Sequence, residues 1–372
     1  MSSPSESPRV LIDARPLQGA SAGRGIGSYL RGLLAGLLEK GFDSHVSLLV
    51  DGRLPAPTVP QGGFVAHAIQ PRYSGRFGLL EEAATLRSRL QRIRPALYHA
   101  TSLALPGRSP VPLVVTLHDL IPWALGGRQM LGERSRWWLG RRLLRGADLV
   151  IAVSESVAAD ARRLAGVEED RLVVVPEGVG PGFRPAAGAA ERVAGRHGLD
   201  RPYLLYVGAL DARKDPYGLL RAWQVARRAG ADVELVLAGS PGRQAPAELP
   251  GALRLGQVSH SELVDLYSAA ACFVFPSRYE GFGLPLLEAM ACGCPVVAYR
   301  NSSIPEVVGE AGVLVEDGDV DALGQAAAEV ACDGDRAAAL RHAGLRRARG
   351  FTWARTAAAT IEAYRRLGFI LR

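Results

Sequence analysis

Long apolar runs are missing from this chain of 372 residues, and no run reaches the roughly 18 residues of a membrane-spanning helix. Residues 1–8 lack the basic and apolar regions of a signal peptide, so we expect a disordered tail there. Together these absences predict a cytoplasmic protein without membrane-spanning helices.

Cysteine is also scarce. Cys292 and Cys294 form a C-x-C pair, with no second pair and no histidine at ligand spacing. A structural zinc site needs four ligands, so the four cysteines are expected to be small core residues rather than a metal site. They are Cys272, Cys292, Cys294 and Cys332.

The formal charge is +7, and the basic residues are unevenly spread. The stretch 128–145 is rich in arginine and contains Trp137 and Trp138. No motif of alternating basic and aromatic residues accompanies it, which argues against nucleic-acid binding. Two interpretations of this predicted helix remain open. It packs its tryptophans into a domain core, or it touches the inner face of an anionic membrane as a peripheral contact.

The length exceeds the 250 to 300 residues at which a single core stops growing, so two domains are expected. Short apolar runs alternate with helical patterns in both halves, which predicts α/β domains with doubly wound parallel sheets facing a cleft. The predicted domains are residues 9–182 and 183–350, with a last helix in 351–372 that crosses back to the first domain. The expected strands are Val10–Ile12, Val46–Val50, Leu97–His99, Leu113–Leu117, Leu149–Val153, Leu172–Val175, Tyr203–Val207, Glu234–Ala238, Leu253–Leu255, Cys272–Phe275, Pro295–Ala298 and Gly312–Val315.

The most informative segment runs from Ser277 to Glu288 and directly follows an apolar strand. Its glycines let the backbone approach a ligand, and Pro285 suits the start of a helix whose free amides form an anion site. A carboxylate beside a phosphate is repelled, so Glu280 and Glu288 are expected to bind sugar hydroxyls. The alternative is an ordinary helix start with acidic residues favoured by the helix dipole.

A second segment places Arg213 and Lys214 in a loop at the end of the strand Tyr203–Val207. Adjacent cations at a strand end suit a diphosphate, because arginine offers a planar fork and lysine a point charge. A solvated surface pair is the alternative.

Glu280 and Glu288 form an E-x7-E motif, and the surrounding text, FVFPSRYEGFGLPLLEAMACGCPVVAYRNSSIPEVVGEAG, resembles retaining glycosyltransferases of family 4. The opening DARPL and GRGIGSY are similar to the mannosyltransferase branch of that family. The resemblance spans about residues 10–364. It implies the GT-B fold of two Rossmann-like domains and transfer of a hexose with retention of configuration.

The resemblance also implies roles for individual residues. Glu288 would hold the ribose, Glu280 and His118 would lie by the donor sugar, and Arg213 and Lys214 would bind the leaving diphosphate. We count His118, Glu280, Arg213 and Lys214 as candidate catalytic residues. The further donor-binding candidates are Gly25, Gly27, Gly208, Val258, Gly281, Phe282, Gly283, Leu284 and Glu288.

Candidates for acceptor contact are Asp119, which follows His118 at a strand end, and Ser154 at the end of the next strand. Glu177 departs from the family, which usually has asparagine before this Gly-Val pair. It either faces the cleft and alters sugar or acceptor preference, or lies in a hinge without a contact.

The donor is expected to be a nucleotide-sugar, with GDP-mannose favoured and a UDP-hexose as the alternative. No cofactor or metal is expected, since the two cations and the helix start supply the positive charge. The acceptor would be a glycan or a lipid-linked glycan. A nucleotide-sugar 2-epimerase could share this fold, and a non-catalytic nucleotide-sugar sensor is a further rival. A phosphorylase lacks a suitable lysine here, and a dehydrogenase lacks the full glycine fingerprint.

Overall fold

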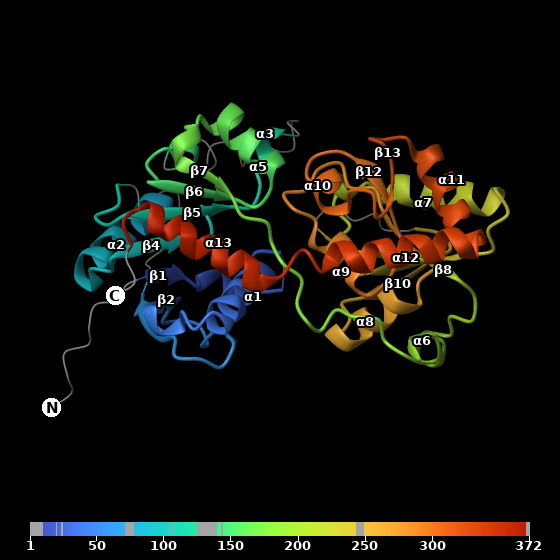
Figure 1. Ribbon diagram of the computed structural model, residues 1–372, viewed down its shortest axis with the longest axis horizontal. Coiled ribbons are helices and arrows are strands. Elements are labelled where there is room, and N and C mark those ends of the chain that lie inside the picture. Colours follow the sequence, from blue (N-terminus) through green and yellow to red (C-terminus); the bar gives the residue numbers. More distant parts are fainter. Residues whose placement is uncertain are drawn as a thin grey trace. The chain divides into compact units, whose positions relative to one another are not determined.

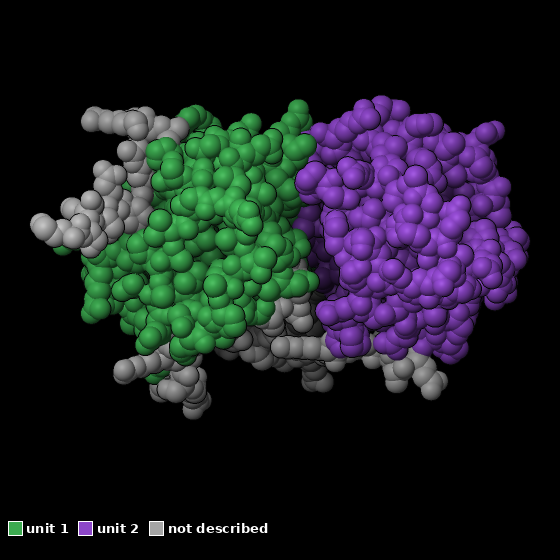
Figure 2. Space-filling view, turned by 90° about the horizontal axis from the view of Figure 1, so that it is seen from below, with its two compact units in different colours: residues 1–178, 352–372 green, residues 179–351 purple. Residues whose placement is uncertain are grey.

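The chain divides into two units, residues 1–178 with 352–372 and residues 179–351 (Figure 2). The computed structural model describes residues 10–19, 21–23, 25–70, 78–103, 105–106, 108–124, 140–142, 144–242 and 249–369. The first boundary falls after residue 178 rather than 182, and the last helix belongs to unit 1. The tail predicted at 1–8 lies outside the described residues.

Unit 1 contains a parallel sheet of seven strands in the order β3-β2-β1-β4-β5-β6-β7. Its central strands are buried on both faces; Val10, Leu11 and Ile12 of β1, for example, have no exposed surface. That burial explains why these strands appear in the sequence as continuous apolar runs. Their bounds are Val10–Asp13 (β1), Val46–Asp51 (β2), Val65–Ile69 (β3), Leu97–Ala100 (β4), Leu113–Leu117 (β5), Leu149–Ala152 (β6) and Leu172–Val174 (β7).

The strand β3 was not predicted from the sequence. It lies at the edge of the sheet and pairs only with β2, and Val65 is 59% exposed. An edge strand that is mostly exposed needs no continuous apolar run, so the sequence pattern is weak there. The helices of this unit include Gly25–Glu39 (α1), Gly78–Ile93 (α2), Ile121–Ala124 (α3), Glu155–Asp160 (α5) and Trp353–Arg366 (α13).

The returning helix α13 packs along α1 (Figure 1). Two glycines of α1 permit the contact: a Cβ at Gly32 would lie 2.0 Å from the Trp353 ring, and one at Gly36 would lie 2.2 Å from the Trp353 carbonyl oxygen. At the other end of α13, the hydroxyl of Tyr364 lies 2.7 Å from the buried His99 of β4. The last helix is therefore an integral part of the core of unit 1.

Unit 2 repeats the arrangement with six parallel strands in the order β10-β9-β8-β11-β12-β13. Both sheets thus reverse their strand order at one point, between β1 and β4 and between β8 and β11. In such sheets ligands bind beyond the carboxyl ends of the strands at that reversal. The strands are Tyr203–Val207 (β8), Glu234–Ala238 (β9), Ala252–Gly256 (β10), Cys272–Phe275 (β11), Val296–Arg300 (β12) and Val313–Glu316 (β13).

The sequence predicts helices of unit 2 at about 218–229, 261–269, 285–291 and 320–330, but it does not predict α6, α10 and α12. The longest of them, α12, contains mainly alanine and arginine and buries only Gly344 and Ala348, so it lacks a clear apolar stripe. The helices are Ala189–His197 (α6), Pro216–Arg228 (α7), His260–Ala269 (α8), Leu284–Ala291 (α9), Ile304–Val308 (α10), Val320–Cys332 (α11) and Gly334–Ala348 (α12).

Candidate functional site

Two loops of unit 2 meet where its strand order reverses. One follows β8 and forms a short 3-10 turn, Ala212–Lys214, and the other follows β11. The amide of Arg278 donates to the carbonyl of Arg213 at 2.9 Å. The Arg278 guanidinium donates to Asp215 at 2.9 Å, while Asp215 also caps α7. These bonds hold the two loops against each other.

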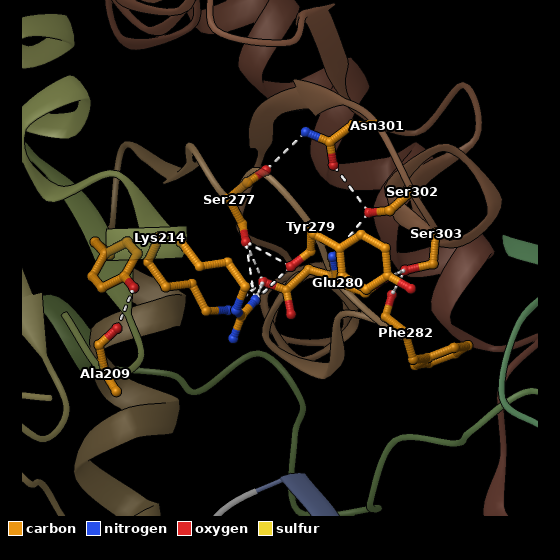
Figure 3. Close-up of polar contacts among 11 residues, drawn as sticks. Ala209, Lys214, Ser277, Tyr279, Glu280, Phe282, Asn301, Ser302 and Ser303 are labelled. Atoms are coloured by element: carbon orange, nitrogen blue, oxygen red, sulfur yellow. Dashed lines mark hydrogen bonds and ion pairs between the residues drawn. The ribbon is translucent and has the colours of Figure 1, made fainter. Parts of the chain in front are cut away.

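The charge cluster comprises Arg213, Lys214, Ser277 and Glu280 and lies on these loops. Figure 3 labels Lys214, Ser277 and Glu280 of this cluster. One carboxylate oxygen, Oε1 of Glu280, accepts hydrogen bonds from all three partners. Arg213 Nη1 lies at 2.9 Å, and Lys214 Nζ and the Ser277 hydroxyl are in direct contact. Lys214 and Glu280 are 7% and 8% exposed, so the pair is largely removed from water.

Burial and pairing act in opposite directions on these groups. Burial lowers the pKa of Lys214 to about 8, even though the Glu280 carboxylate favours the charged form. Burial would raise the pKa of Glu280, but the charges of Lys214 and Arg213 outweigh it and lower that pKa. The carboxylate is therefore ionised at neutral pH, and Lys214 changes charge just above it.

Three polar residues after β12 hold the backbone of the Glu280 loop. The Ser302 hydroxyl accepts from the amide of Glu280 at 2.9 Å, and the Ser303 hydroxyl donates to the carbonyls of Glu280 and Phe282 at 3.0 and 2.8 Å. Asn301 donates to the Ser277 carbonyl at 2.9 Å. Sequence reasoning assigned no role to Asn301, Ser302, Ser303 or Ser277, although three polar residues at a strand end were a usable signal.

The start of α9 follows this loop as predicted from the sequence. Gly283 adopts a left-handed conformation with φ of 103°, and no side chain caps the helix. One turn later, Glu288 accepts a hydrogen bond from the buried Tyr267 hydroxyl at 3.3 Å. Phe282 is buried and its ring lies 6.0 Å from that of Phe351. Between the two glutamates of the motif, Gly281, Phe282 and Gly283 thus lead into α9, which begins at Leu284.

Three glycines end neighbouring strands of unit 2 and approach one another closely. Gly239 donates its amide to Gly256 at 2.7 Å, and a Cβ at Gly239 would lie 2.3 Å from the carbonyl oxygen of Gly208. Gly208 itself has a φ of 145°. Val258 follows two residues after Gly256. The predicted donor-binding residues Gly208 and Val258 therefore follow β8 and β10, which lie on either side of β9.

Unit 1 brings together a second set of candidates. His118 follows β5 directly, and its Nδ1 lies 3.3 Å from Oε1 of Glu177. The His118 ring also meets the Tyr29 ring edge to face, with centroids 4.7 Å apart. Glu177 is thus neither a hinge residue without a contact nor exposed, because it is 4% exposed and bonded to His118.

Other candidates in unit 1 have structural contacts. Ser154 caps α5 by accepting from the Val157 amide at 3.1 Å, and Asp119 accepts from the Ile121 amide at 3.2 Å. The sequence predicts a glycine-rich loop that includes Gly25 and Gly27, but α1 begins at Gly25, so both glycines lie in its first turn. A Cβ at Gly27 would lie 2.3 Å from the Ala22 carbonyl oxygen, which explains this glycine by packing.

Asp317 and Asp319 form an Asp-x-Asp pattern after β13 that sequence reasoning overlooked. Asp317 accepts from the Asn301 side chain at 2.8 Å, and Asp319 caps α11 by accepting from the Ala322 amide at 2.9 Å. Both carboxylates therefore have local structural partners.

Two sequence hypotheses concern regions away from these clusters. Cys272, Cys292 and Cys294 are buried as expected, whereas Cys332 is exposed. Most of the basic stretch 128–145, including both tryptophans, lies outside the described residues. Among the residues that are described, no helix is long and apolar enough to cross a membrane.

Comparison with known proteins identifies the family. Residues 23–183 match the model described as "Glycosyltransferase Family 4", and residues 201–333 match "Glycosyl transferases group 1". The O-antigen chain mannosyltransferase B of Escherichia coli is 33% identical over 73% of this chain and 74% of its own length. This chain is a glycosyltransferase of family 4.

Two further similarities extend this assignment. The serotype-specific mannosyltransferase WbdA of Escherichia coli is 26% identical over 96% of the chain, which spans about half of that protein, 48%. The structure of sucrose-phosphate synthase from Thermosynechococcus elongatus superposes with a TM-score of 0.79 at 25% identity, covering 97% of this chain and 99% of that one. The two doubly wound domains of the glycosyltransferase are thus those of the GT-B fold.

Proposed function

We propose that this glycosyltransferase moves a hexose, with mannose favoured, from a nucleotide-sugar to a hydroxyl group of a glycan or lipid-linked acceptor. The observation that carries the proposal is the charge cluster of unit 2. It places two cations at the reversal of strand order, where α/β sheets bind ligands.

The cations suit the charge that develops during the reaction. When the bond between the sugar and the diphosphate breaks, negative charge grows on the phosphate oxygens. Arg213, Lys214 and the uncapped start of α9 can stabilise that charge with groups already in position. The proposed reaction therefore needs no metal ion. Incubation with EDTA and then with Mg²⁺ tests this, since a metal requirement would appear as activity that EDTA removes and Mg²⁺ restores.

Glu280 has a different part in the proposal. Its Oε1 holds the two cations, and among the described residues no hydrogen bond to Oε2 is found. We assign Oε2 to hydroxyls of the transferred sugar. The lowered pKa of Glu280 keeps the carboxylate ionised and able to accept such bonds.

We propose retention of anomeric configuration through front-face attack. The acceptor oxygen forms a bond to the anomeric carbon as the bond to the phosphate oxygen breaks, and that phosphate oxygen takes the acceptor proton. A double displacement is the alternative, in which Oε2 of Glu280 would be the nucleophile because Oε1 already accepts three hydrogen bonds. NMR of the first-formed product distinguishes retention from inversion.

GDP-mannose is the favoured donor because two relatives are named mannosyltransferases. A UDP-hexose remains the alternative donor. The deciding experiment incubates the enzyme with GDP-mannose, UDP-glucose, UDP-galactose and UDP-GlcNAc and measures slow hydrolysis and thermal shift for each. Hydrolysis of one donor supports transfer, and stabilisation without any hydrolysis favours a nucleotide-sugar sensor.

The lipid-linked acceptor would be met at the inner face of a membrane, and we propose the basic stretch 128–145 as the peripheral contact. Its arginines and two tryptophans suit an anionic surface. Sedimentation with vesicles containing anionic lipid at low salt tests this. Failure to pellet with them contradicts the membrane contact and leaves the transferase proposal intact.

A further inference from the structure

The contact between His118 and Glu177 joins residues that are far apart in the sequence. His118 directly follows β5, and Glu177 lies three residues after β7, the second strand from β5 in the sheet. Their side chains are 13% and 5% exposed, and Nδ1 of the imidazole lies 3.3 Å from the carboxylate. The other ring nitrogen, Nε2, is buried and has no hydrogen-bond partner among the described residues.

The chemistry of the pair restricts where the proton lies. An ionised carboxylate only accepts hydrogen bonds, so Nδ1 must carry the hydrogen that it shares with Glu177. A neutral imidazole has one hydrogen, which leaves a lone pair on Nε2. A buried hydrogen-bond acceptor that lacks a donor destabilises the protein. A ligand that donates a hydrogen bond to Nε2 would remove this cost.

We propose that Glu177 is a positioning residue, which fixes His118 as the Nδ1–H tautomer so that Nε2 accepts a hydrogen bond from a hydroxyl of the transferred hexose. This inference rests on the proposed function for the identity of the ligand. It does not depend on that function for the tautomer itself.

The surrounding structure holds both partners in place. The Pro176 carbonyl accepts from the Thr356 hydroxyl at 2.8 Å. A Cβ at Gly178 would lie 2.4 Å from the Trp353 amide nitrogen, so α13 packs directly on the backbone after Glu177. The residues before and after Glu177 are therefore both held by contacts with α13.

The ring of His118 is held in the same way by Tyr29. Tyr29 meets the ring edge to face, and its hydroxyl is bonded to Thr116 at 2.9 Å. Thr116 is in turn 2.7 Å from Nε2 of His99.

Two other titratable groups that face His118, Tyr29 and His99, are uncharged at neutral pH. Burial raises the pKa of Tyr29 far above its usual range, and burial lowers the pKa of His99 to about 3, with His118 adding to that shift. Asp119, the next residue, accepts from the Ile121 amide. Glu177 is the carboxylate that bonds the ring among the described residues, so its removal should change the proton position most.

The first test reads the tautomer without any substrate. Protein labelled with ¹⁵N-histidine has seven histidines, and the His118 signals are identified by their loss in His118→Asn. We expect a protonated Nδ1 and an unprotonated Nε2 at pH 8 in the wild type. In Glu177→Gln the side-chain amide can donate to Nδ1, so we expect the proton to move to Nε2. A wild-type proton on Nε2, or an unchanged tautomer in Glu177→Gln, overturns the proposal.

The second test measures turnover of the donor found by the nucleotide-sugar panel. Carboxylates that orient a functional histidine are typically worth about 10- to 100-fold, so Glu177→Gln should lower kcat by about that factor. The KM for the donor should change little, and Glu177→Gln should cost little more in a His118→Asn background. Glu168→Gln is the matched control, because its side chain is 73% exposed and pairs with Arg171 near the same strand.

The outcomes separate the two proposals. If the wild type turns over none of the donors, the proposed function fails while the NMR measurement still decides the tautomer. If the wild type is active and Glu177→Gln keeps full kcat, the positioning role is wrong and the transferase assignment stands.

Discussion

The two sheets of this glycosyltransferase have the same strand order around their reversal, yet they use that position differently. In unit 2 the reversal carries Arg213, Lys214 and Glu280 on the loops after β8 and β11. In unit 1 the last residue of β1, Asp13, pairs with Arg15 of the following turn at 2.6 Å, and Asp13 is fully buried. The same strand order therefore carries two adjacent cations in unit 2 and an ion pair between Asp13 and Arg15 in unit 1.

The functional candidates of unit 1 lie on later strands of its sheet. His118 and Glu177 follow β5 and β7, and their pair holds one ring and one carboxylate instead of two cations. We therefore expect the two units to have different roles. Unit 2 would stabilise the charge of the leaving diphosphate, and unit 1 would contact neutral hydroxyls.

The largest expected effect comes from removing a cation of unit 2. Arg213→Ala and Lys214→Ala should each lower kcat by about 100- to 1,000-fold, as when other groups that stabilise developing charge are lost. Steady-state turnover of the hydrolysed donor measures this. Arg336→Ala is the control, since this arginine is exposed on α12 and should leave kcat unchanged. Wild-type rates in both variants would contradict the assignment of the charge cluster.

Removing the carboxylate of the cluster should lower the stability of the protein as well as its activity. Glu280→Gln leaves the buried Lys214 without its counter-charge, and breaking such a pair costs about 3–5 kcal/mol in the free energy of unfolding. Glu329→Gln, which breaks the exposed pair with Arg336, should cost no more than about 1 kcal/mol. Urea denaturation measures both. Equal effects in the two variants would mean that the charge cluster behaves like a surface pair.

Nucleotide binding should depend on unit 2 alone. Glu288→Ala should weaken binding of the free nucleoside diphosphate by about tenfold or somewhat more, the value of a hydrogen bond to a charged group. His118→Asn should leave that affinity unchanged, because the proposed contact of His118 is with the sugar. Isothermal titration calorimetry with GDP and UDP measures this. Tyr267→Phe separates the loss of Glu288 from the loss of the Tyr267 contact at 3.3 Å.

The smallest effect is the pH dependence of donor binding. The pKa of Lys214 is lowered to about 8, so the ammonium is present below pH 8 and is lost as the pH rises. If the donor binds only the charged form, the dissociation constant should rise about tenfold between pH 7 and pH 9. Lys214→Arg should flatten this dependence, because a guanidinium keeps its charge. A flat profile in the wild type would show that Lys214 does not hold the diphosphate.

The sequence predicted the segments of the site better than their mutual contacts. The Ser277–Glu288 segment and the Arg213-Lys214 pair could be identified because glycines, adjacent cations and spaced carboxylates follow apolar strands. Their direct contact through Glu280 Oε1 was not predicted, since the two segments are separated by more than sixty residues. The assignment of separate ligands to Glu280 and to the cations therefore omitted their bond to each other.

Local patterns were enough to predict the strands with buried faces, the two domains and the helix that begins after Gly283. Those features depend on continuous apolar runs, glycine and proline, which act over a few residues. The edge strand β3 and the helix α12 were not predicted, because neither buries a clear apolar face.

Local sequence patterns could not predict the contact between Glu177 and His118. It depends on which strands become neighbours, and on α13 returning against α1 through Gly32 and Gly36 to support the backbone around Glu177. Short-range preferences thus predicted which residues are candidates for the chemistry. Long-range packing established which of them touch, because the distances between loop residues follow from strand order and not from spacing along the chain.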